Sequence, residues 1–289
     1  MRTFETATKT DWIVDRALRG IIGSALALPY ATRVRWFGAV IEKVIAPLAG
    51  YRKRAEDQLA FIWPDMPKAE RRTMAKAVCN NFGRTMIENY SGADFAKQIE
   101  TAKVSGEGLA ALARAKEEGR PVLFVTGHFG NHEAPRQALV QRGYTIGGLY
   151  RPIANPYFNA HYEKNMLDMS GAVFPQGRKG TVGFVRMLRD GGMGTLLFDV
   201  RATLHPKIPF MGQPAHTATS VADIALKLNA LVIPYFGIRQ SDGLSFEVAI
   251  EAPIALTDAD QMMAEITARL EARINENPEQ WFWVHRRWG

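Results

Sequence analysis

The 289-residue chain has a single cysteine, Cys79, so no disulfide can form within it. Small secreted domains often depend on several disulfides, whereas a lone cysteine suits a reducing compartment. Residues 1–10 are polar, and Asp11 and Asp15 interrupt any apolar region that could serve as a cleavable signal. We therefore expect the protein to stay on the cytoplasmic side of a membrane.

The sequence also lacks a long uncharged run. Residues 12–50 are rich in isoleucine, leucine, valine and tryptophan, but the longest stretch without a charged residue, Gly20–Thr32, has only 13 residues. A helix of that length cannot cross a hydrocarbon core of about 30 Å. We expect residues 1–50 to lie on a membrane or to dip into it.

Within that region, apolar side chains recur at helical spacing at Val34, Phe37, Val40, Ile41, Val44, Ile45 and Leu48. Arg33, Arg35 and Lys43 are available for phospholipid headgroups, and the basic residues 52–54 would suit anionic lipid if they face the same way. An ordinary pair of core helices is the alternative that this pattern leaves open.

Acidic residues are fewer than basic residues in this sequence. Asp and Glu number 29 against 36 Lys and Arg, which gives a formal net charge of +7. This balance favours an anionic partner, such as nucleic acid, a membrane surface, an acidic protein or a phosphorylated substrate. The short signatures of nucleic-acid-binding domains are absent, so we expect one of the last three. With 47% hydrophobic residues the chain can form one substantial core.

The chain is organised around residues 122–133. Val122–Thr126 is a short apolar run typical of a buried strand, and Gly127 ends it just before His128. A helix is expected from about residue 132 to 140, with Asn131 as its N-cap and Glu133 in its first turn. The pattern predicts a strand, a glycine-flanked turn and a helix, with an imidazole at the strand end.

His128 and Glu133 are a histidine and a carboxylate that a turn can bring together, as a general base requires. The motif has no Ser or Cys nucleophile, which indicates direct transfer of a group to a substrate hydroxyl. Two alternatives remain. His128 and His132 could simply cap or pack the turn, or they could bind a metal together with Glu133, although the order is not His-Glu-x-x-His.

Cationic residues follow two other segments. Tyr144–Tyr150 is expected to form a strand that ends at Arg151, where the next residue is proline, so Arg151 should lie at the same end of the sheet as His128. We expect Arg151 to bind a phosphate or carboxylate. Arg178 lies in a glycine-bounded basic turn, Pro175–Gly180, that suits a phosphate or is simply a solvated loop.

Several motifs resemble one known family. His-Phe-Gly-Asn-His-Glu at 128–133 resembles the His-x4-Asp/Glu motif of glycerolipid and lipid A acyltransferases. The late acyltransferases of lipid A biosynthesis, the lauroyl/myristoyl transferases, are the closer match. That match also rests on Phe61–Met66 with its Pro-Asp turn, Asn81–Thr85, Tyr150–Pro152 with Asn155-Pro156, and the terminal Pro278–Trp288.

The resemblance implies an α/β fold of the glycerolipid-acyltransferase type, with a central sheet flanked by helices. It divides the chain into a membrane-associating helical region at 1–50 and an acyltransferase domain at 51–289, of which 51–100 is a helical lead-in. Lys164 falls where family members often carry arginine, and Asp199 matches the Asp of the family's Asp-Gln segment. Both are therefore expected, with Arg151 and Arg178, among the substrate-binding residues.

The function implied is transfer of a fatty acyl chain from acyl carrier protein to a hydroxyl of a lipid A precursor, at the cytoplasmic face of an inner membrane. His128 would be the base and Glu133 its partner, without metal or other cofactor. Expected partners are the carrier protein, the lipid A precursor and an anionic membrane surface, with no nucleic acid. Alternatives are an acyltransferase for another acceptor, such as a lysophospholipid or aminolipid, and a non-catalytic membrane-binding member of the fold.

Overall fold

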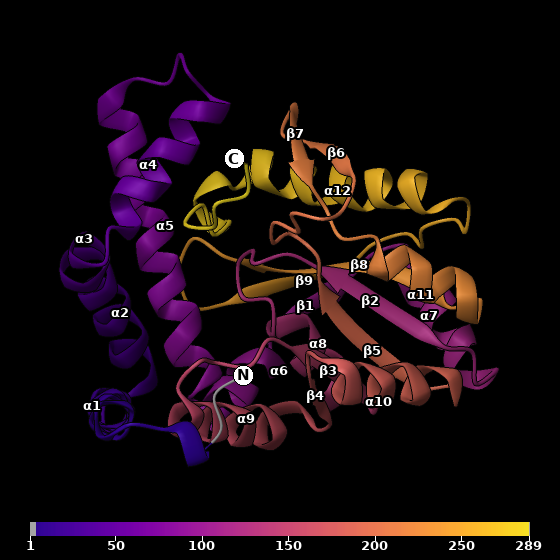
Figure 1. The fold of residues 1–289 in the computed structure, drawn as a ribbon, viewed down its shortest axis with the longest axis horizontal. Coiled ribbons are helices and arrows are strands. Elements are labelled where there is room, and N and C mark those ends of the chain that lie inside the picture. The colour runs from indigo at the N-terminus through magenta and orange to yellow at the C-terminus, as the bar shows by residue number, and fades with distance from the viewer. Residues whose placement is uncertain (1–3, 289) are drawn as a thin grey trace.

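The structure, a computed structural model, describes residues 4–288 and centres on a seven-stranded, mostly parallel sheet in the order β1-β9-β8-β2-β5-β3-β4 (Figure 1). Its strands are β1 (Lys103–Ser105), β2 (Val122–Thr126), β3 (Ile146–Tyr150), β4 (Val173–Pro175), β5 (Met193–Leu197), β8 (Leu231–Arg239) and β9 (Phe246–Ile250). A separate antiparallel hairpin consists of β6 (Lys207–Phe210) and β7 (Gln213–His216). The α/β class predicted from the sequence is confirmed.

Helices surround the sheet. They are α1 (Lys9–Leu26), α2 (Tyr30–Val40), α3 (Ala46–Leu48), α4 (Tyr51–Ile62), α5 (Lys68–Asn89), α6 (Gly92–Glu100), α7 (Gly108–Glu117), α8 (Ala134–Gln141), α9 (Pro156–Ser170), α10 (Arg178–Arg189), α11 (Ser220–Leu228) and α12 (Ala259–Glu276). A π-helical turn, Ile41–Ile45, joins α2 to α3, and short 3-10 helices lie at Phe4–Thr6 and Pro278–Gln280.

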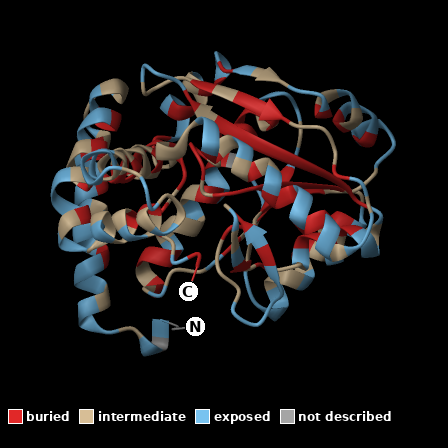
Figure 2. Cartoon of the chain, turned by 90° about the horizontal axis from the view of Figure 1, so that it is seen from above, coloured by how far each residue is buried: buried red, intermediate tan, exposed pale blue. Residues whose placement is uncertain are grey.

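The alternation of side chains along β2 separates two hydrophobic clusters. Leu123 and Val125 pack with residues of α10, α11 and α12, whereas Val122 and Phe124 pack with residues of α6, α7 and α8. All five residues of β2 are buried, and the buried colour runs along the strands in Figure 2. A continuous apolar run is what a parallel strand covered on both faces requires.

The strand directions determine where polar residues can gather. β8, β2, β5, β3 and β4 are parallel, and β9 is antiparallel to β8. The five parallel strands therefore end at one edge of the sheet, and this edge carries the residues that follow β2, β3 and β5. In open α/β sheets, ligands bind at this carboxyl edge.

The N-terminal helices form a layer beside that edge, with α5 between them and the sheet (Figure 1). Glycines allow α2 and α5 to pack closely: a Cβ on Gly83 would lie 3.0 Å from the Cα of Gly38 and 2.8 Å from the Cβ of Ile41. Within residues 4–288, no helix combines the length and apolarity that crossing a membrane would need.

The apolar stripe expected to face a membrane is divided in the structure. Val34, Phe37 and Ile41 are buried in a cluster with residues of α1 and α5, while Leu48 is 83% exposed. Arg33 is also buried, so the expectation that it meets headgroups is wrong. Its guanidinium donates to the carbonyls of residues 26 and 28 and to Ser91, because α2 turns this face toward the protein.

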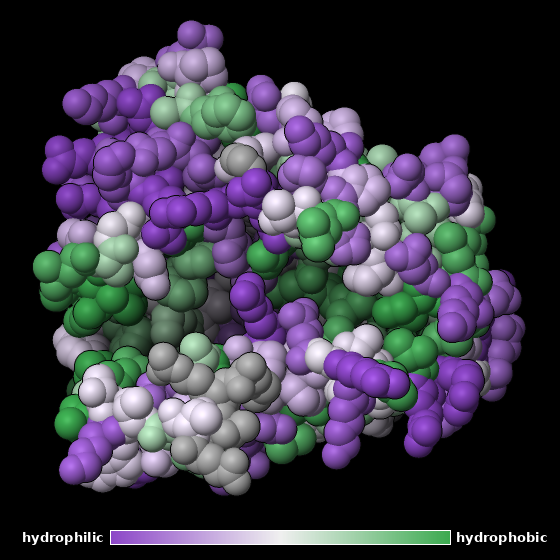
Figure 3. Space-filling view, in the orientation of Figure 1, coloured by the Kyte–Doolittle hydropathy of each residue, from purple (hydrophilic) through white to green (hydrophobic). Residues whose placement is uncertain are grey.

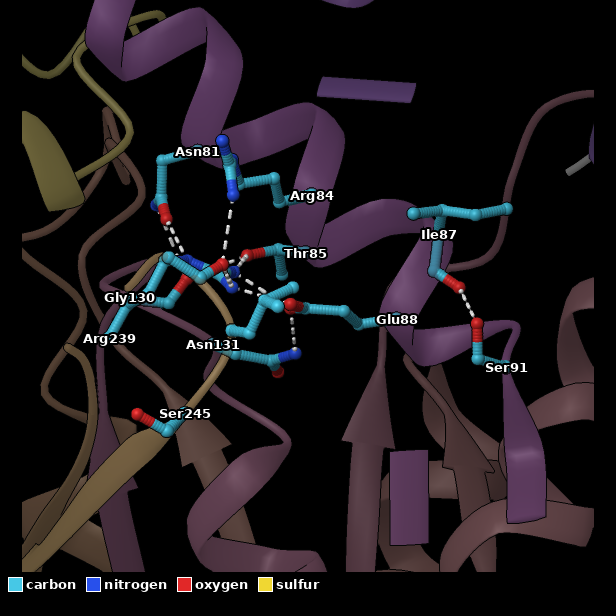
Figure 4. A network of polar contacts seen from close by, with 12 residues as sticks. Asn81, Arg84, Thr85, Ile87, Glu88, Ser91, Gly130, Asn131, Arg239 and Ser245 are labelled. Atoms are coloured by element: carbon cyan, nitrogen blue, oxygen red, sulfur yellow. Dashed lines mark hydrogen bonds and ion pairs between the residues drawn. The ribbon is translucent and has the colours of Figure 1, made fainter. Parts of the chain in front are cut away.

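A buried network of polar side chains links α5 to the sheet edge (Figure 4). Thr85 and Glu88 lie three residues apart, so both face the same way. Glu88 is fully buried and receives Arg239 from the end of β8 in a two-point ion pair, with Nη2 2.7 Å from Oε2. Thr85 donates to the carbonyl of Gly130 (2.8 Å), and Asn131 donates to Glu88 (3.0 Å). The network therefore fixes the turn after β2 against α5.

We predict that Arg239→Met lowers the free energy of unfolding by about 3–5 kcal/mol, because it leaves the Glu88 carboxylate buried without its cation. Arg189→Met is the matched control, since among the described residues Arg189 forms an ion pair only with the exposed Asp190, and loss of a surface ion pair costs about 0–1 kcal/mol. Urea unfolding measures both. Equal losses in the two variants would contradict the assigned role of the network.

Candidate functional site

His128 and Asp199 meet at the carboxyl ends of two adjacent strands. The register pairs Thr126 of β2 with Leu197 of β5, so the residues two positions further on lie side by side. Nδ1 of His128 is 2.8 Å from Oδ1 of Asp199, and the backbone N–H of His128 donates to Oδ2 at 2.8 Å. Trp281 adds a third hydrogen bond, from Nε1 to Oδ2 at 2.9 Å.

Asp199 is fully buried and held as a carboxylate. Burial on its own would raise the pKa of Asp199, but the neighbouring charge of His128 and the hydrogen bonds from its ring and backbone keep this pKa well below the usual range. A carboxylate only accepts hydrogen bonds, so Nδ1 of His128 carries the proton. In the neutral imidazole, Nε2 of His128 is then left as an acceptor, which is the state that a general base requires.

Two glycines give the backbone the room that this contact needs. A Cβ on Gly127 would lie 3.0 Å from Oδ2 of Asp199 and 2.7 Å from Cδ2 of Leu270. Gly130 has φ +54°, and a Cβ there would lie 1.9 Å from the carbonyl oxygen of Gly237. Larger residues at either position would push the turn away from the sheet.

The C-terminal segment closes over the turn. The backbone N–H of Phe282 donates to the carbonyl of His128 (2.9 Å), and that of Gly130 donates to the carbonyl of Gln280 (2.9 Å). Trp281 is fully buried between these bonds and reaches Asp199. These backbone hydrogen bonds place His285, which is four residues after Trp281, against His128, and the centroids of the two imidazole rings are 4.5 Å apart.

Two cavities meet at His128. The first, about 370 Å³, has mainly apolar walls that include Val78, Phe82, Met86, Phe158 and Phe282. The second, about 490 Å³, is more polar and lies over the ends of β3 and β5. Figure 3 shows a hollow with largely hydrophobic walls between the N-terminal helices and the rest of the molecule. Five residues contribute to the walls of both cavities: His128, His132, Arg151, Tyr162 and His285.

The two histidines beside His128 are less basic than usual. The pKa of His132 is lowered to about 4 and that of His285 to about 4; burial is the main cause, and the nearby charge of His128 contributes to both. Burial similarly raises the pKa of Tyr162 to about 12. At neutral pH the site therefore contains two neutral imidazoles and a neutral phenol around His128.

Glu133 does not take the position that the motif predicts for it. Among the described residues, the carboxylate hydrogen-bonded to the His128 ring is Asp199, and Glu133 lies 3.5 Å from Nη1 of Arg136 instead. The reason is that α8 starts directly after residue 133, so Glu133 turns with the helix toward Arg136 one turn on. Glu133 still lines the second cavity, and its buried Oε2 accepts no hydrogen bond within residues 4–288.

The four expected substrate-binding residues occupy different environments. Arg151 is exposed at the end of β3 and lines both cavities, whereas Asp199 lies behind His128 and faces no solvent. Lys164 pairs with Asp168 (2.5 Å) on the exposed side of α9 and lines neither of these two cavities. Arg178 is exposed in the first turn of α10 and likewise lines neither.

Sequence reasoning missed the parts that Trp281 and His285 play in the site. Both lie in the terminal segment Pro278–Trp288, which at the level of the sequence contributed only to the family resemblance. The signal that could have found them is a histidine and several buried-type aromatics concentrated in one short basic segment. Within residues 4–288, no group of three His, Cys, Asp or Glu side chains is arranged to hold a metal ion.

Comparison with known proteins gives consistent matches over nearly the whole chain. The family model for bacterial lipid A biosynthesis acyltransferases matches residues 5–289. A lipid A biosynthesis acyltransferase of Haemophilus influenzae is 28% identical over 91% of this chain and 86% of its own length. The lipid A biosynthesis lauroyltransferase of Escherichia coli is 24% identical over 93% and 89%, and lipid A biosynthesis acyltransferase 2 of Shigella flexneri is 22% identical over 86% and 79%.

We expect the free energy of unfolding to decrease as the pH falls from 6.5 toward 4. His132 and His285 stay neutral in the folded chain down to a pKa of about 4, whereas in the unfolded chain they take up protons near 6.5, so acid favours unfolding. Urea unfolding at several pH values in this window gives the slope. His132→Gln should make that slope shallower, and an unchanged slope would contradict the burial of a neutral imidazole at this position.

Proposed function

The chain belongs to the bacterial lipid A biosynthesis acyltransferase family, and we propose that it moves a fatty acyl chain from acyl carrier protein to a hydroxyl of a lipid A precursor. One observation carries this proposal: His128, backed by a buried carboxylate, lies where an apolar cavity meets a polar one. An acyltransferase needs an apolar and a polar cavity that meet at the base, because the apolar acyl chain of the donor and the charged acceptor must both reach it.

The chemistry follows from the state of His128. Nε2 takes the proton of the acceptor hydroxyl as its oxygen attacks the thioester carbonyl carbon, and Asp199 stabilises the imidazolium that forms. The tetrahedral intermediate then collapses, the C–S bond breaks, and the thiolate takes the proton from Nε2 of His128. The acyl chain is now an ester of the acceptor, and no acyl-enzyme intermediate is needed.

The linings of the two cavities suggest which substrate part each receives. The apolar cavity, with Val78, Phe82 and Met86 on one face of α5, suits the hydrocarbon chain. The second cavity has Arg151 and Arg201 in its wall and suits the anionic acceptor, whose phosphates pair well with guanidinium groups. Arg201 is half-buried, and its Nε has no hydrogen-bond partner within residues 4–288.

We assign Glu133 to the acceptor. Its Oε2 is buried, is ion-paired with Nη1 of Arg136 at 3.5 Å without a hydrogen bond, and belongs to the wall of the second cavity. A hydroxyl of the acceptor can supply the missing hydrogen bond and would then be held near His128, which leaves the same turn of the chain. Glu133 thus has a part in catalysis through the substrate, while Asp199 acts through the imidazole.

We also propose that residues 1–50 hold the enzyme to the cytoplasmic face of the inner membrane. Exposed apolar side chains gather on α1 and on the segment from α2 to α3: Trp12, Ile13, Val14, Leu18, Ile21, Trp36, Val44, Ile45 and Leu48. Figure 3 shows such a cluster over α2 and α3. Arg35 and Lys43 are exposed within the same region and can meet anionic headgroups.

His128→Ala and Asp199→Asn should each lower kcat at least about 100-fold, the lower end of what general-base assistance contributes. Glu133→Gln should lower kcat/KM about 10- to 100-fold, because a hydrogen bond to a charged group is worth ~1.5–3 kcal/mol. The assay measures acyl transfer from acyl carrier protein to a lipid A precursor, with a lysophospholipid offered in parallel.

Asp57→Asn is the control, since Asp57 is exposed, pairs with Lys53 and lines neither cavity. It should retain wild-type turnover. Near-normal turnover of His128→Ala would remove the catalytic assignment, and preference for the lysophospholipid would replace the proposed acceptor.

Co-sedimentation with vesicles that contain anionic phospholipid tests the membrane face. Replacing Trp12 and Leu48 with serine should reduce the bound fraction, because both side chains are largely exposed and would enter the lipid interface. Leu204→Ser is the control: Leu204 is 99% exposed but lies in the loop before β6. Equal binding of all variants would contradict the proposed face.

A further inference from the structure

His285 is a titratable group beside His128 that has no part in the mechanism proposed above. Its ring meets that of His128 edge-on, with centroids 4.5 Å apart and planes at 73°. It lines both cavities, as His128 does, so it borders the space where donor and acceptor must meet. Phe282 also packs edge-on against the His285 ring, with centroids 4.8 Å apart.

The two nitrogens of His285 have different surroundings. Nε2 is buried and has no hydrogen-bond partner among the described residues, although the residue as a whole is only half-buried. Nδ1 is not buried in this way, so it is the ring nitrogen open to the cavities that His285 lines. A buried N–H without an acceptor is costly, so the proton belongs on Nδ1, where water or a substrate can accept it.

The reaction creates a need for such a donor. When the acceptor hydroxyl attacks, the π electrons of the carbonyl move to its oxygen, and a preorganised N–H aimed at that oxygen stabilises the transition state more than the ground state. His128 cannot fulfil this role, because its Nδ1–H is committed to Asp199 and its Nε2 takes the proton of the hydroxyl. The donor must be a separate group next to His128.

Of the residues shared by the two cavities, His285 fits this need best. The ring of Tyr162 packs edge-on against that of Tyr150, with centroids 6.1 Å apart, and not against His128. The rings of His132 and His128 are 5.6 Å apart, farther than those of His285 and His128. Arg151 is exposed and free to follow a phosphate of the acceptor. A neutral imidazole can donate its N–H without giving up a proton, and it does not add a second positive charge beside the His128 imidazolium.

We propose that the Nδ1–H of His285 donates a hydrogen bond to the thioester carbonyl oxygen and holds the negative charge that develops there as the acceptor hydroxyl attacks. The hydroxyl oxygen forms the new C–O bond, its proton goes to Nε2 of His128, and collapse of the oxyanion breaks the C–S bond. The imidazolium then returns the proton to the departing sulfur. This role rests on the proposed acyl transfer and makes His285 a catalytic residue beside His128.

Three substitutions of His285 in the full chain test the proposal. His285→Ala removes the donor, His285→Asn keeps an N–H near the position of Nδ1, and His285→Gln places one near the position of Nε2. We expect the Ala and Gln variants to lose about 100- to 1,000-fold in kcat with KM little changed, the usual effect of removing one oxyanion donor. The Asn variant should recover most of that loss.

His161→Asn is the matched control. His161 is also half-buried, and its Nε2 is likewise buried without a partner within residues 4–288, but it lines neither cavity. Its kcat should stay near that of the wild type. Thermal unfolding of each variant shows whether the chain is folded, and the pH profile of kcat shows whether His128 still titrates as in the wild type.

The outcomes separate this role from the proposed function. If the wild-type protein transfers no acyl group, the proposed function itself fails. If the wild type is active and His285→Ala keeps its kcat, the His285 role alone is overturned. It is also overturned if His285→Asn is as slow as His285→Ala, or if the folded Ala variant is slow because its pH profile has shifted, since His285 would then act by positioning His128.

Discussion

An ionised carboxylate buried at the edge of the sheet is the constraint on which the rest of the site depends. Burying Asp199 without partners would cost several kcal/mol, so its oxygens must be met by donors. The donors come from the turn after β2 and from Trp281 in the C-terminal segment. Satisfying one charge therefore brings together three distant parts of the chain and, as a by-product, fixes the tautomer of His128.

A second buried carboxylate applies the same rule to the helical layer. Glu88 on α5 is matched by Arg239 from β8 and by Asn131 from the turn after His128. The apolar face of α5, which forms one wall of the first cavity, is thereby held in a defined position relative to the base. The polar network in Figure 4 therefore joins α5, which lines the first cavity, to the turn that follows His128.

Local patterns were enough for the elements but not for their partners. The strand at Val122–Thr126, the turn and the helix after it follow from apolar periodicity and glycine positions, and the structure has all three. The helix begins at Ala134, however, with Glu133 and not Asn131 at the N-cap position. The expected contact between His128 and Glu133 depended on how the turn is oriented, and there the start of α8 directs Glu133 to Arg136. Arg33 was misjudged for a similar reason, since periodicity identifies an apolar stripe but not the element that covers it.

The sequence by itself determined the class of fold, the family and the imidazole at the end of the central strand, because each of these is written in short segments of neighbouring residues. Only the tertiary structure decided which carboxylate supports that imidazole, which face of the N-terminal helices stays exposed, and that His285 returns from the end of the chain to the side of His128. The physical reason is that strand order and the pairing of buried charges join residues far apart in the chain. No local pattern records those distances.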